Sequence, residues 1–192
     1  MTEKKFDPKK LEKLNNPQRL VDIPPAYVLE RLNLVQPEVL VEIGAGTGFF
    51  SIAFLQATQA AQLYACEISE PMLDWMREQL VPDHPEIIPV LTKDEAIPLA
   101  DEIADLVFMI CLHHELDHSA LTLNEAKRLL RPGGRLFVVD WKKEEMAQGP
   151  PANIRCTAQE VAQQLQEAGL SEVHSYSELA KHFLVVATKA AG

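Results

Sequence analysis

The sequence predicts a doubly wound α/β fold, in which helices cover both faces of a mostly parallel sheet. Short apolar runs rich in β-branched residues alternate with segments of helical spacing along most of the 192 residues. These runs hold few polar positions, as expected for strands that are buried on both faces. The last two runs have no helix between them, so the final strand should pair in antiparallel fashion at the sheet edge.

Hydrophobic spacing and turn residues place the individual elements. Strands are expected at residues 38–44, 61–68, 86–92, 104–112, 135–141, 171–179 and 181–189. Helices are expected at residues 25–32, 47–58, 69–80, 119–130 and 157–170. Ser69 is the expected N-cap of one helix, and Thr157 with Glu160 has the spacing of a capping box. The Arg-Pro-Gly-Gly segment at 131–134 should end the helix before it.

We expect residues 1–192 to form a single domain, with residues 1–24 as an N-terminal arm. The first 16 residues hold five lysines and few apolar side chains, and prolines mark turns further on. Two alternatives stay open for this region. It is either a solvated arm or a lid over a ligand pocket, with Phe6, Arg19 and Tyr27 as the candidate contacts.

Charge and cysteine content exclude several classes of protein. Lys plus Arg is 18 and Asp plus Glu is 28, so the net charge is −10. An acidic surface argues against nucleic-acid binding and against an anionic membrane. The three cysteines lie far apart, and the chain starts without a signal-peptide pattern, so a cytoplasmic location is expected. No coiled-coil heptads appear, so the sequence predicts no particular oligomeric state.

A glycine-rich turn follows the first predicted strand and marks the candidate ligand site. Gly44, Gly46 and Gly48 alternate with small residues and stand just before a predicted helix. Glycines allow positive φ angles and let a ligand approach the backbone closely. The N-terminus of the following helix offers free N–H groups that suit a carboxylate or a phosphate. Open α/β sheets bind ligands at this edge, outside the carboxyl ends of their strands.

The spacing of these glycines does not match a dinucleotide site. In the G-x-G-x-x-G pattern, the third glycine would fall on Phe49 or on Ser51. Glu67 ends the second predicted strand, 19 residues after Gly48, where a carboxylate can accept two ribose hydroxyls and would repel a 2′-phosphate. Because Glu67 also suits the ribose of a nicotinamide cofactor, a nicotinamide-dependent oxidoreductase remains an alternative. Phe49 disfavours it, because this residue occupies the slot of the third glycine.

Four ordered segments resemble the class I S-adenosylmethionine-dependent methyltransferases, and in particular the small-molecule group that includes the quinone-biosynthesis enzymes. The segments are VLVEIGAGTGFFSIAFL, LYACEIS, IPLADEIADLVFMICLHHELD and EAKRLLRPGGRLFVVDWKKEE. The resemblance covers about residues 20–189. It implies a Rossmann-like sheet of seven strands in the order 3-2-1-4-5-7-6, with the seventh strand antiparallel. It also implies S-adenosyl-L-methionine as the cofactor and a small molecule as the methyl acceptor.

The resemblance also implies roles for individual residues. Glu42 and the three glycines would cradle the methionine part of the cofactor. Glu67 would bind the adenosine ribose, and Ile68 would pack on adenine. Members of the family usually carry an Asp near adenine after the third strand. Here Lys93 takes that slot, and the nearest acidic residues are Asp94 and Glu95.

Residues after the fourth strand are expected to line the cofactor and the entrance for the substrate. They are Cys111, Leu112 and His113, and His113 is the candidate general base because histidine titrates near neutral pH. The alternative for His113 is a loop histidine that only shapes the pocket. Trp141, at the end of the fifth strand, could stack on an aromatic acceptor or simply cover the core.

The segment 114–118 also fits the zinc-peptidase pattern H-E-x-x-H. That pattern needs both histidines on one helix, yet Leu112 ends a predicted strand and Asp117 or Ser119 is the better N-cap. The slots for a further ligand hold Leu121 and Asn124, so no metal site is predicted.

The sequence therefore predicts methyl transfer from S-adenosylmethionine by in-line displacement. The sulfonium already activates the methyl group, so the protein must mainly orient the acceptor in a dry pocket. A catalytically silent cofactor-binding protein remains a further alternative.

Overall fold

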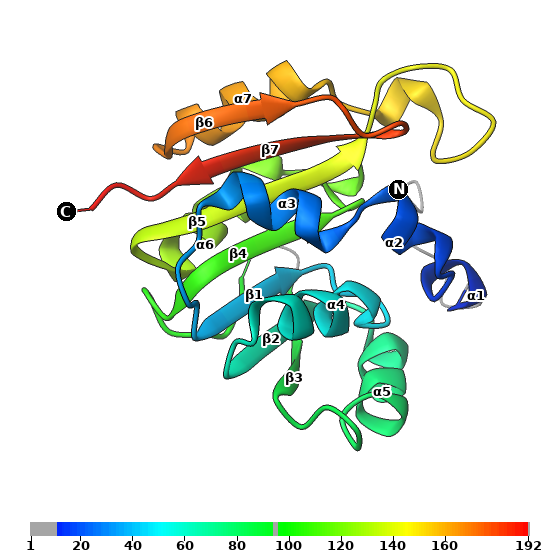
Figure 1. Cartoon of the computed structure of the whole chain (residues 1–192), viewed down its shortest axis with the longest axis vertical. Coiled ribbons are helices and arrows are strands. Elements are labelled where there is room, and N and C mark those ends of the chain that lie inside the picture. The colour runs from blue at the N-terminus through cyan, green and yellow to red at the C-terminus, as the bar shows by residue number, and fades with distance from the viewer. Residues whose placement is uncertain (1–10, 94–95, 192) are drawn as a thin grey trace.

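The computed structural model describes residues 11–93 and 96–191, so the predicted contacts of Phe6, Asp94 and Glu95 lie outside the described residues. Seven strands form one sheet in the order β3-β2-β1-β4-β5-β7-β6 (Figure 1). The strands are β1 Val39–Ile43, β2 Gln62–Glu67, β3 Ile87–Leu91, β4 Ala104–Ile110, β5 Leu130–Trp141, β6 Ser171–Tyr176 and β7 His182–Thr188. β7 is antiparallel to both β5 and β6, and the other pairs are parallel. The predicted fold class and strand order are confirmed.

Helices cover both faces of this sheet, as the apolar strands require. They are α1 Leu11–Leu14, α2 Gln18–Asp22, α3 Pro25–Leu32, α4 Phe49–Thr58, α5 Glu70–Gln79, α6 Ser119–Leu129 and α7 Ala158–Glu167. One core joins α3, α4 and α5 to the sheet, and a second core joins α6 and α7 to the opposite face. In Figure 1, α3 and α4 cross the face nearest the viewer. Within the described residues, no helix is both long and apolar enough to cross a membrane.

Aromatic side chains fill the centre of the first core. The ring centres of Phe54, Phe108 and Phe137 lie 5.0 to 5.1 Å from one another, and all three side chains are fully buried. Such contacts add to the stabilisation from buried apolar area. They fix α4 against β4 and β5, and so they fix the start of α4 beside the strand ends.

The capping residues behave mostly as predicted. The Thr157 side chain accepts a hydrogen bond from the Glu160 N–H at 3.1 Å, and the Glu160 carboxylate accepts one from the Thr157 N–H at 2.6 Å. This capping box satisfies two donors at the start of α7. Ser69 occupies the N-cap position of α5 but makes no side-chain capping bond there.

The start of β5 differs from the prediction. Helix α6 ends at Leu129, but β5 begins at once at Leu130, five residues earlier than predicted, and includes the Arg-Pro-Gly-Gly segment. The pairing with β4 shifts register between Ala104 and Leu106, and this shift absorbs the extra residues. Gly133 has φ +79°, and its N–H donates to the carbonyl of Lys189 at 2.9 Å. The glycines therefore turn the chain inside the strand.

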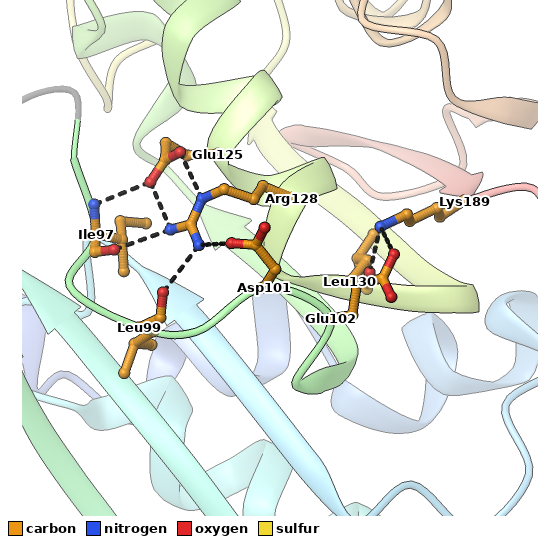
Figure 2. A network of polar contacts seen from close by, with 8 residues as sticks. All are labelled: Ile97, Leu99, Asp101, Glu102, Glu125, Arg128, Leu130 and Lys189. Carbon is orange, nitrogen blue, oxygen red and sulfur yellow. Dashed lines mark hydrogen bonds and ion pairs between the residues drawn. The ribbon is translucent and has the colours of Figure 1, made fainter.

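Arg128 on α6 holds the segment that leads into β4 (Figure 2). Its guanidinium donates to both oxygens of Glu125, each at 2.8 Å, and to Asp101 at 2.6 Å. It also donates to the carbonyls of Ile97 and Leu99 at 2.9 and 2.8 Å. The carboxylates beside it raise the pKa of this guanidinium above its ordinary range. One side chain thus joins α6 to residues 97–101 and sets where β4 enters the sheet.

We predict that Arg128→Met lowers the free energy of unfolding by about 2 kcal/mol or more, because several charge-assisted bonds are lost and Glu125 is left without its partner. Urea denaturation measures the loss. The control is Arg77→Met, which removes an ion pair with Glu70 and Asp74 on the exposed surface of α5. That change should leave the free energy of unfolding almost unchanged, because exposed ion pairs contribute little. Equal losses in the two variants would contradict the assigned role.

Candidate active site

The candidate site lies at the switch point of the sheet, between β1 and β4, where strands stop being added on the β2 side of β1 and start being added on the β4 side. The strands β1, β2, β4 and β5 are parallel, so their carboxyl ends share one edge of the sheet. Because β7 runs antiparallel, it begins at this same edge, with His182 opposite Trp141. Sheets of this kind bind ligands outside this edge. The predicted site residues of β1, β2 and β4 are therefore brought together.

The glycine turn, residues 44–48, leaves β1 and enters α4 with left-handed backbone angles. The φ angles are +74° at Gly44, +58° at Gly46 and +72° at Gly48. Side chains other than glycine rarely adopt such angles, which explains the alternating pattern. A Cβ atom at Gly44 would lie 2.7 Å from the Leu112 side chain. Leu112 therefore packs directly on the turn, next to the predicted position of the cofactor.

Glu67 ties the end of β2 to this turn. Its Oε2 accepts a hydrogen bond from the Gly46 N–H at 2.8 Å. Its Oε1 accepts bonds from the N–H groups of Ile68 and Ser69 at 2.9 and 3.0 Å. Ile68 is 39% exposed beside this carboxylate. An acidic acceptor next to an open apolar side chain fits the ribose and the base of a nucleoside, so these residues suit an adenosine-containing cofactor.

Glu42 is buried beneath the turn, with 2% of its surface exposed. Burial raises its pKa to about 8, while the hydrogen bond from Ser51 and the charge of Arg19 act in the opposite direction. The Ser51 hydroxyl donates to Glu42 Oε2, so β1 and α4 are linked behind the glycines. The carboxyl group is therefore mostly protonated at neutral pH.

The described part of the N-terminal arm lies against the glycine turn. The Thr47 hydroxyl donates to Asn15 Oδ1 at 3.0 Å, and a Cβ atom at Gly46 would lie 3.1 Å from Leu14 Cδ1. Arg19 donates to the Leu14 carbonyl at 2.6 Å, and its guanidinium carbon lies 4.6 Å from the centre of the Phe50 ring. Of the two alternatives for the arm, these contacts favour the lid.

Cys111 follows β4 and carries a positive φ of +55°. Burial raises the pKa of its thiol to about 12, and the nearby Arg19 guanidinium only partly offsets this effect. A protonated thiol is a poor nucleophile, so Cys111 can shape the site but is not activated for chemistry.

His113 points toward α7 and is almost fully buried, with 2% exposed. Its Nε2 lies 2.7 Å from Gln164 Oε1, and its Nδ1 is buried without a hydrogen-bond partner. Burial lowers the pKa of His113, which keeps the imidazole neutral at pH 7, the form that a base requires. Its role as the base stays a prediction.

His114 forms a second polar link at the strand ends, which the sequence did not single out. Its Nδ1 lies 2.8 Å from Asp140 Oδ1, and its N–H donates to Asp140 Oδ2 at 2.9 Å. Burial alone would lower the pKa of His114, but the bonds and charges of Asp140 and Glu115 outweigh it and raise the pKa to about 9. The pair of a cationic imidazole and a carboxylate joins the loop after β4 to the end of β5.

The prediction that the H-E-x-x-H segment, residues 114–118, is not a single helix is confirmed. His113–Glu115 is a single 3-10 turn, and α6 starts at Ser119. The N-cap is His118, and not Asp117 or Ser119, so the predicted cap was wrong by one residue. Within residues 11–93 and 96–191, no group of three His, Cys, Asp or Glu side chains is placed to hold a metal.

Trp141 is the last residue of β5, and the loop after it lies at the same edge of the sheet. The Trp141 ring lies 4.3 Å from the His182 ring, and a Cβ atom at Gly149 would lie 2.7 Å from Trp141 Cε3. Trp141 is therefore covered by protein, which favours the alternative of a structural cover. Arg155 is 3% exposed and donates to backbone carbonyls of the loop, namely those of Lys142, Glu144, Gln148 and Pro150.

Comparison with known proteins agrees with this geometry. The fold and the glycine turn with Glu67 define a protein that binds an adenosine-containing cofactor at the switch point of its sheet. The sequence matches the family described as "Methyltransferase domain" over residues 41–138. The chain belongs to this family and is an S-adenosylmethionine-dependent methyltransferase. Family membership removes the ground for the nicotinamide-dependent alternative.

A solved S-adenosylmethionine-dependent methyltransferase from Aquifex aeolicus is 30% identical, with a TM-score of 0.88 over 97% of this chain and 100% of that one. The malonyl-[acyl-carrier protein] O-methyltransferase of Methylococcus capsulatus is 31% identical over 147 residues, or 71% of this chain and 53% of that protein. The ubiquinone/menaquinone biosynthesis C-methyltransferase UbiE of Paraburkholderia xenovorans is 32% identical over 119 residues, or 61% and 49%. The chain thus spans about half the length of these curated relatives.

We predict that the buried carboxyl group of Glu42 makes the free energy of unfolding depend on pH. The unfolded chain ionises this carboxyl near pH 4.3, whereas the folded chain keeps the proton until about pH 8. The unfolded state therefore binds fewer protons between these values, and Glu42 lowers the free energy of unfolding as pH rises through this window. We expect Glu42→Gln to raise the thermal midpoint more at pH 8 than at pH 5.

Calorimetric melting at the two pH values measures this effect. The control is Glu38→Gln, because Glu38 is an exposed carboxyl four residues earlier. It should shift both midpoints equally and only slightly. A Glu42→Gln gain that is the same at pH 5 and pH 8 would show that the buried carboxyl does not hold its proton.

Proposed function

We propose that this protein transfers a methyl group from S-adenosylmethionine to a small-molecule acceptor by in-line displacement, as a single cytoplasmic domain. The observation that carries the proposal is the bond between Glu67 and the Gly46 N–H at 2.8 Å. It puts the predicted ribose acceptor and the predicted methionine cradle on one rigid unit. When bound, the cofactor supplies a methyl group that its sulfonium has already activated.

The residues of the chain would bind the cofactor and orient it for the transfer. In this proposal, Glu42 and the glycine turn hold the methionine part of the cofactor, and Glu67 and Ile68 hold the adenosine. Cys111 and Leu112 complete the wall after β4. The predicted adenine contacts of Asp94 and Glu95 stay part of the proposal. The exposed side of Ile68 supports the placement of adenine, because an apolar surface there would otherwise face water.

The histidines after β4 would handle the proton of the acceptor. His113 remains our candidate for the base, supported by its lowered pKa and by its unpartnered Nδ1. His114 is held by Asp140 and is mostly protonated at neutral pH, so it suits the stabilisation of a negative charge better than proton removal.

The names of the relatives suggest which acceptors to test. One relative is named for O-methylation of a malonyl-acyl carrier protein, and another for C-methylation in quinone biosynthesis. Both kinds of acceptor are starting points only, because the chain spans about half of each relative. Methyl transfer from radiolabelled S-adenosylmethionine to these acceptors and to simple phenols tests the reaction. Binding of the cofactor without transfer to any acceptor would support a catalytically silent protein instead.

We predict that Gly46→Arg abolishes cofactor binding. A side chain at φ +58° strains the turn and projects where the cofactor would lie, next to Leu14. Isothermal calorimetry with S-adenosylmethionine, S-adenosylhomocysteine and NAD measures binding, and we expect wild type to bind the first two and not NAD. The matched control is Gly133→Arg, because Gly133 is also left-handed, with φ +79°, but nothing lies within 4 Å of its Cβ position. Retained binding in Gly46→Arg would refute the site.

We also predict that deletion of residues 1–20 weakens cofactor binding and turnover by tenfold or more. The deletion removes Leu14, Asn15 and Arg19, which contact the glycine turn and Phe50. Calorimetry and the radiolabel assay measure the two effects. Urea denaturation serves as the control for a fold that stays intact. Unchanged affinity and turnover in a folded variant would rule out the lid.

A further inference from the structure

His182 is a buried histidine that the protein itself leaves unsatisfied. It is the first residue of β7 and is 2% exposed, and among residues 11–93 and 96–191 neither ring nitrogen has a hydrogen-bond partner. The rest of β7 is apolar up to Thr188, so a polar ring is out of place in this strand. Buried polar groups are nearly always paired, and each exception calls for an explanation. The missing partner is therefore expected to come from outside the described part of the chain.

The position of His182 points to the methyl-transfer site. Its register partner is Trp141, at the carboxyl end of β5, so it lies at the sheet edge that also carries the glycine turn. Side chains alternate along a strand, and Leu184 and Val186 belong to the core under α3 and α4. His182 therefore faces the same side of the sheet as the N-terminal arm.

Charged groups around His182 are already engaged with one another. Lys181 donates to Asp22 at 2.7 Å and to Gln148 at 3.0 Å. Asp140 is taken by His114. Arg19 acts electrostatically on His182 and on Cys111, so it connects this ring to the wall of the cofactor site. None of these groups bonds the His182 ring.

The ring is uncharged under ordinary conditions. Burial lowers the pKa of His182 to about 4, although Asp22 and Asp140 act in the opposite direction. A neutral imidazole offers one donor and one acceptor. The neutral ring therefore suits a neutral hydroxyl group, which can both accept and donate a hydrogen bond. It carries no positive charge to balance the charge of a carboxylate.

An open cleft is lined by the two residues that precede His182. A cleft of about 410 Å³ runs between the loop after β5 and the start of β7. Its lining residues are Glu144, Met146, Ala147, Gln148, Ala180 and Lys181. Ala180 and Lys181 directly precede His182. Arg155 donates to the carbonyls of Lys142, Glu144 and Gln148, and these bonds fix the loop that lines the cleft.

We propose that His182 binds the methyl acceptor, and that it selects an uncharged acceptor carrying a hydroxyl group over one carrying a carboxylate. This inference rests on the proposed function, because it names the substrate class of that same site. His182 touches the acceptor in this proposal but takes no proton from it.

Two variants test this assignment. His182→Leu and His182→Phe remove both ring nitrogens and keep an apolar side chain at the site. Because the unpaired nitrogens cost stability, at least one variant should unfold at a higher urea concentration than wild type. The control is His174→Leu, which alters an exposed histidine on β6 and should leave the midpoint unchanged within error. A lower midpoint for both His182 variants would overturn the proposal, because it would show that the ring is bonded within the fold.

Ligand binding gives the second readout. Ligand-detected nuclear magnetic resonance should show that catechol binds wild type and His174→Leu at least tenfold more tightly than either His182 variant, and that benzoate binds none of them. Equal binding of catechol by wild type and the His182 variants, or no binding by any of them, would overturn the proposal. His182→Gln, which restores one donor and one acceptor, should recover part of the affinity.

Affinity for S-adenosylhomocysteine separates this proposal from the proposed function. The His182 variants should bind it within twofold of wild type. If wild type fails to bind it, the proposed function fails, while the catechol and urea results still decide the role of His182.

Discussion

The carboxylate of Glu67 is the interaction on which the rest of the site depends. It accepts backbone hydrogen bonds from the glycine turn after β1 and from the start of α5 after β2. Two adjacent parallel strands thus end in one connected surface, and the Glu67 side chain helps to hold the turn at Gly46. The burial of Glu42 below and the packing of Leu112 above complete this surface. A shift in Glu67 would therefore disturb the strand ends, the turn and the first turn of α4 together.

The carboxyl group of Asp140 connects two further strand ends, those of β4 and β5, at the same edge of the sheet. Asp140 accepts bonds from the N–H and the ring of His114 and from the N–H of Trp141. Three donors satisfy the carboxyl group, which is 2% exposed, so it is not left unpaired in its buried position. The ends of β4 and β5 are fixed in this way, and the ring of Trp141 is fixed with them. Between the two links lies the space bordered by Arg19, Cys111 and His182.

Some of these features could be predicted from the sequence because the backbone itself demands them. Alternating glycines at a strand end, an acidic residue at the end of the next strand, and the capping box of α7 are local signals with a physical cause. The start of β5 was missed because Pro-Gly-Gly ordinarily ends a helix, whereas here a register shift accommodates it inside the strand. Arg155 was missed because its partners are carbonyl groups, which leave no trace in the sequence. His182 was missed because one histidine in an apolar run looks like part of the core.

The side-chain partners of His113 and His114 could not be predicted from the sequence either. The sequence placed both rings after β4. It could not show that one ring turns to Gln164 on α7 and the other to Asp140 on β5. That division depends on which strands and helices are neighbours, so adjacent identical residues acquire opposite pKa shifts.

The contact of Leu14 and Asn15 with the glycine turn has a kinetic consequence. These residues cover Gly46 and Thr47, which belong to the proposed cofactor site. In that proposal, cofactor exchange would displace α1, and the bond between Asn15 and Thr47 would break and form again. Arm opening would then be a step of every turnover that is separate from the transfer of the methyl group.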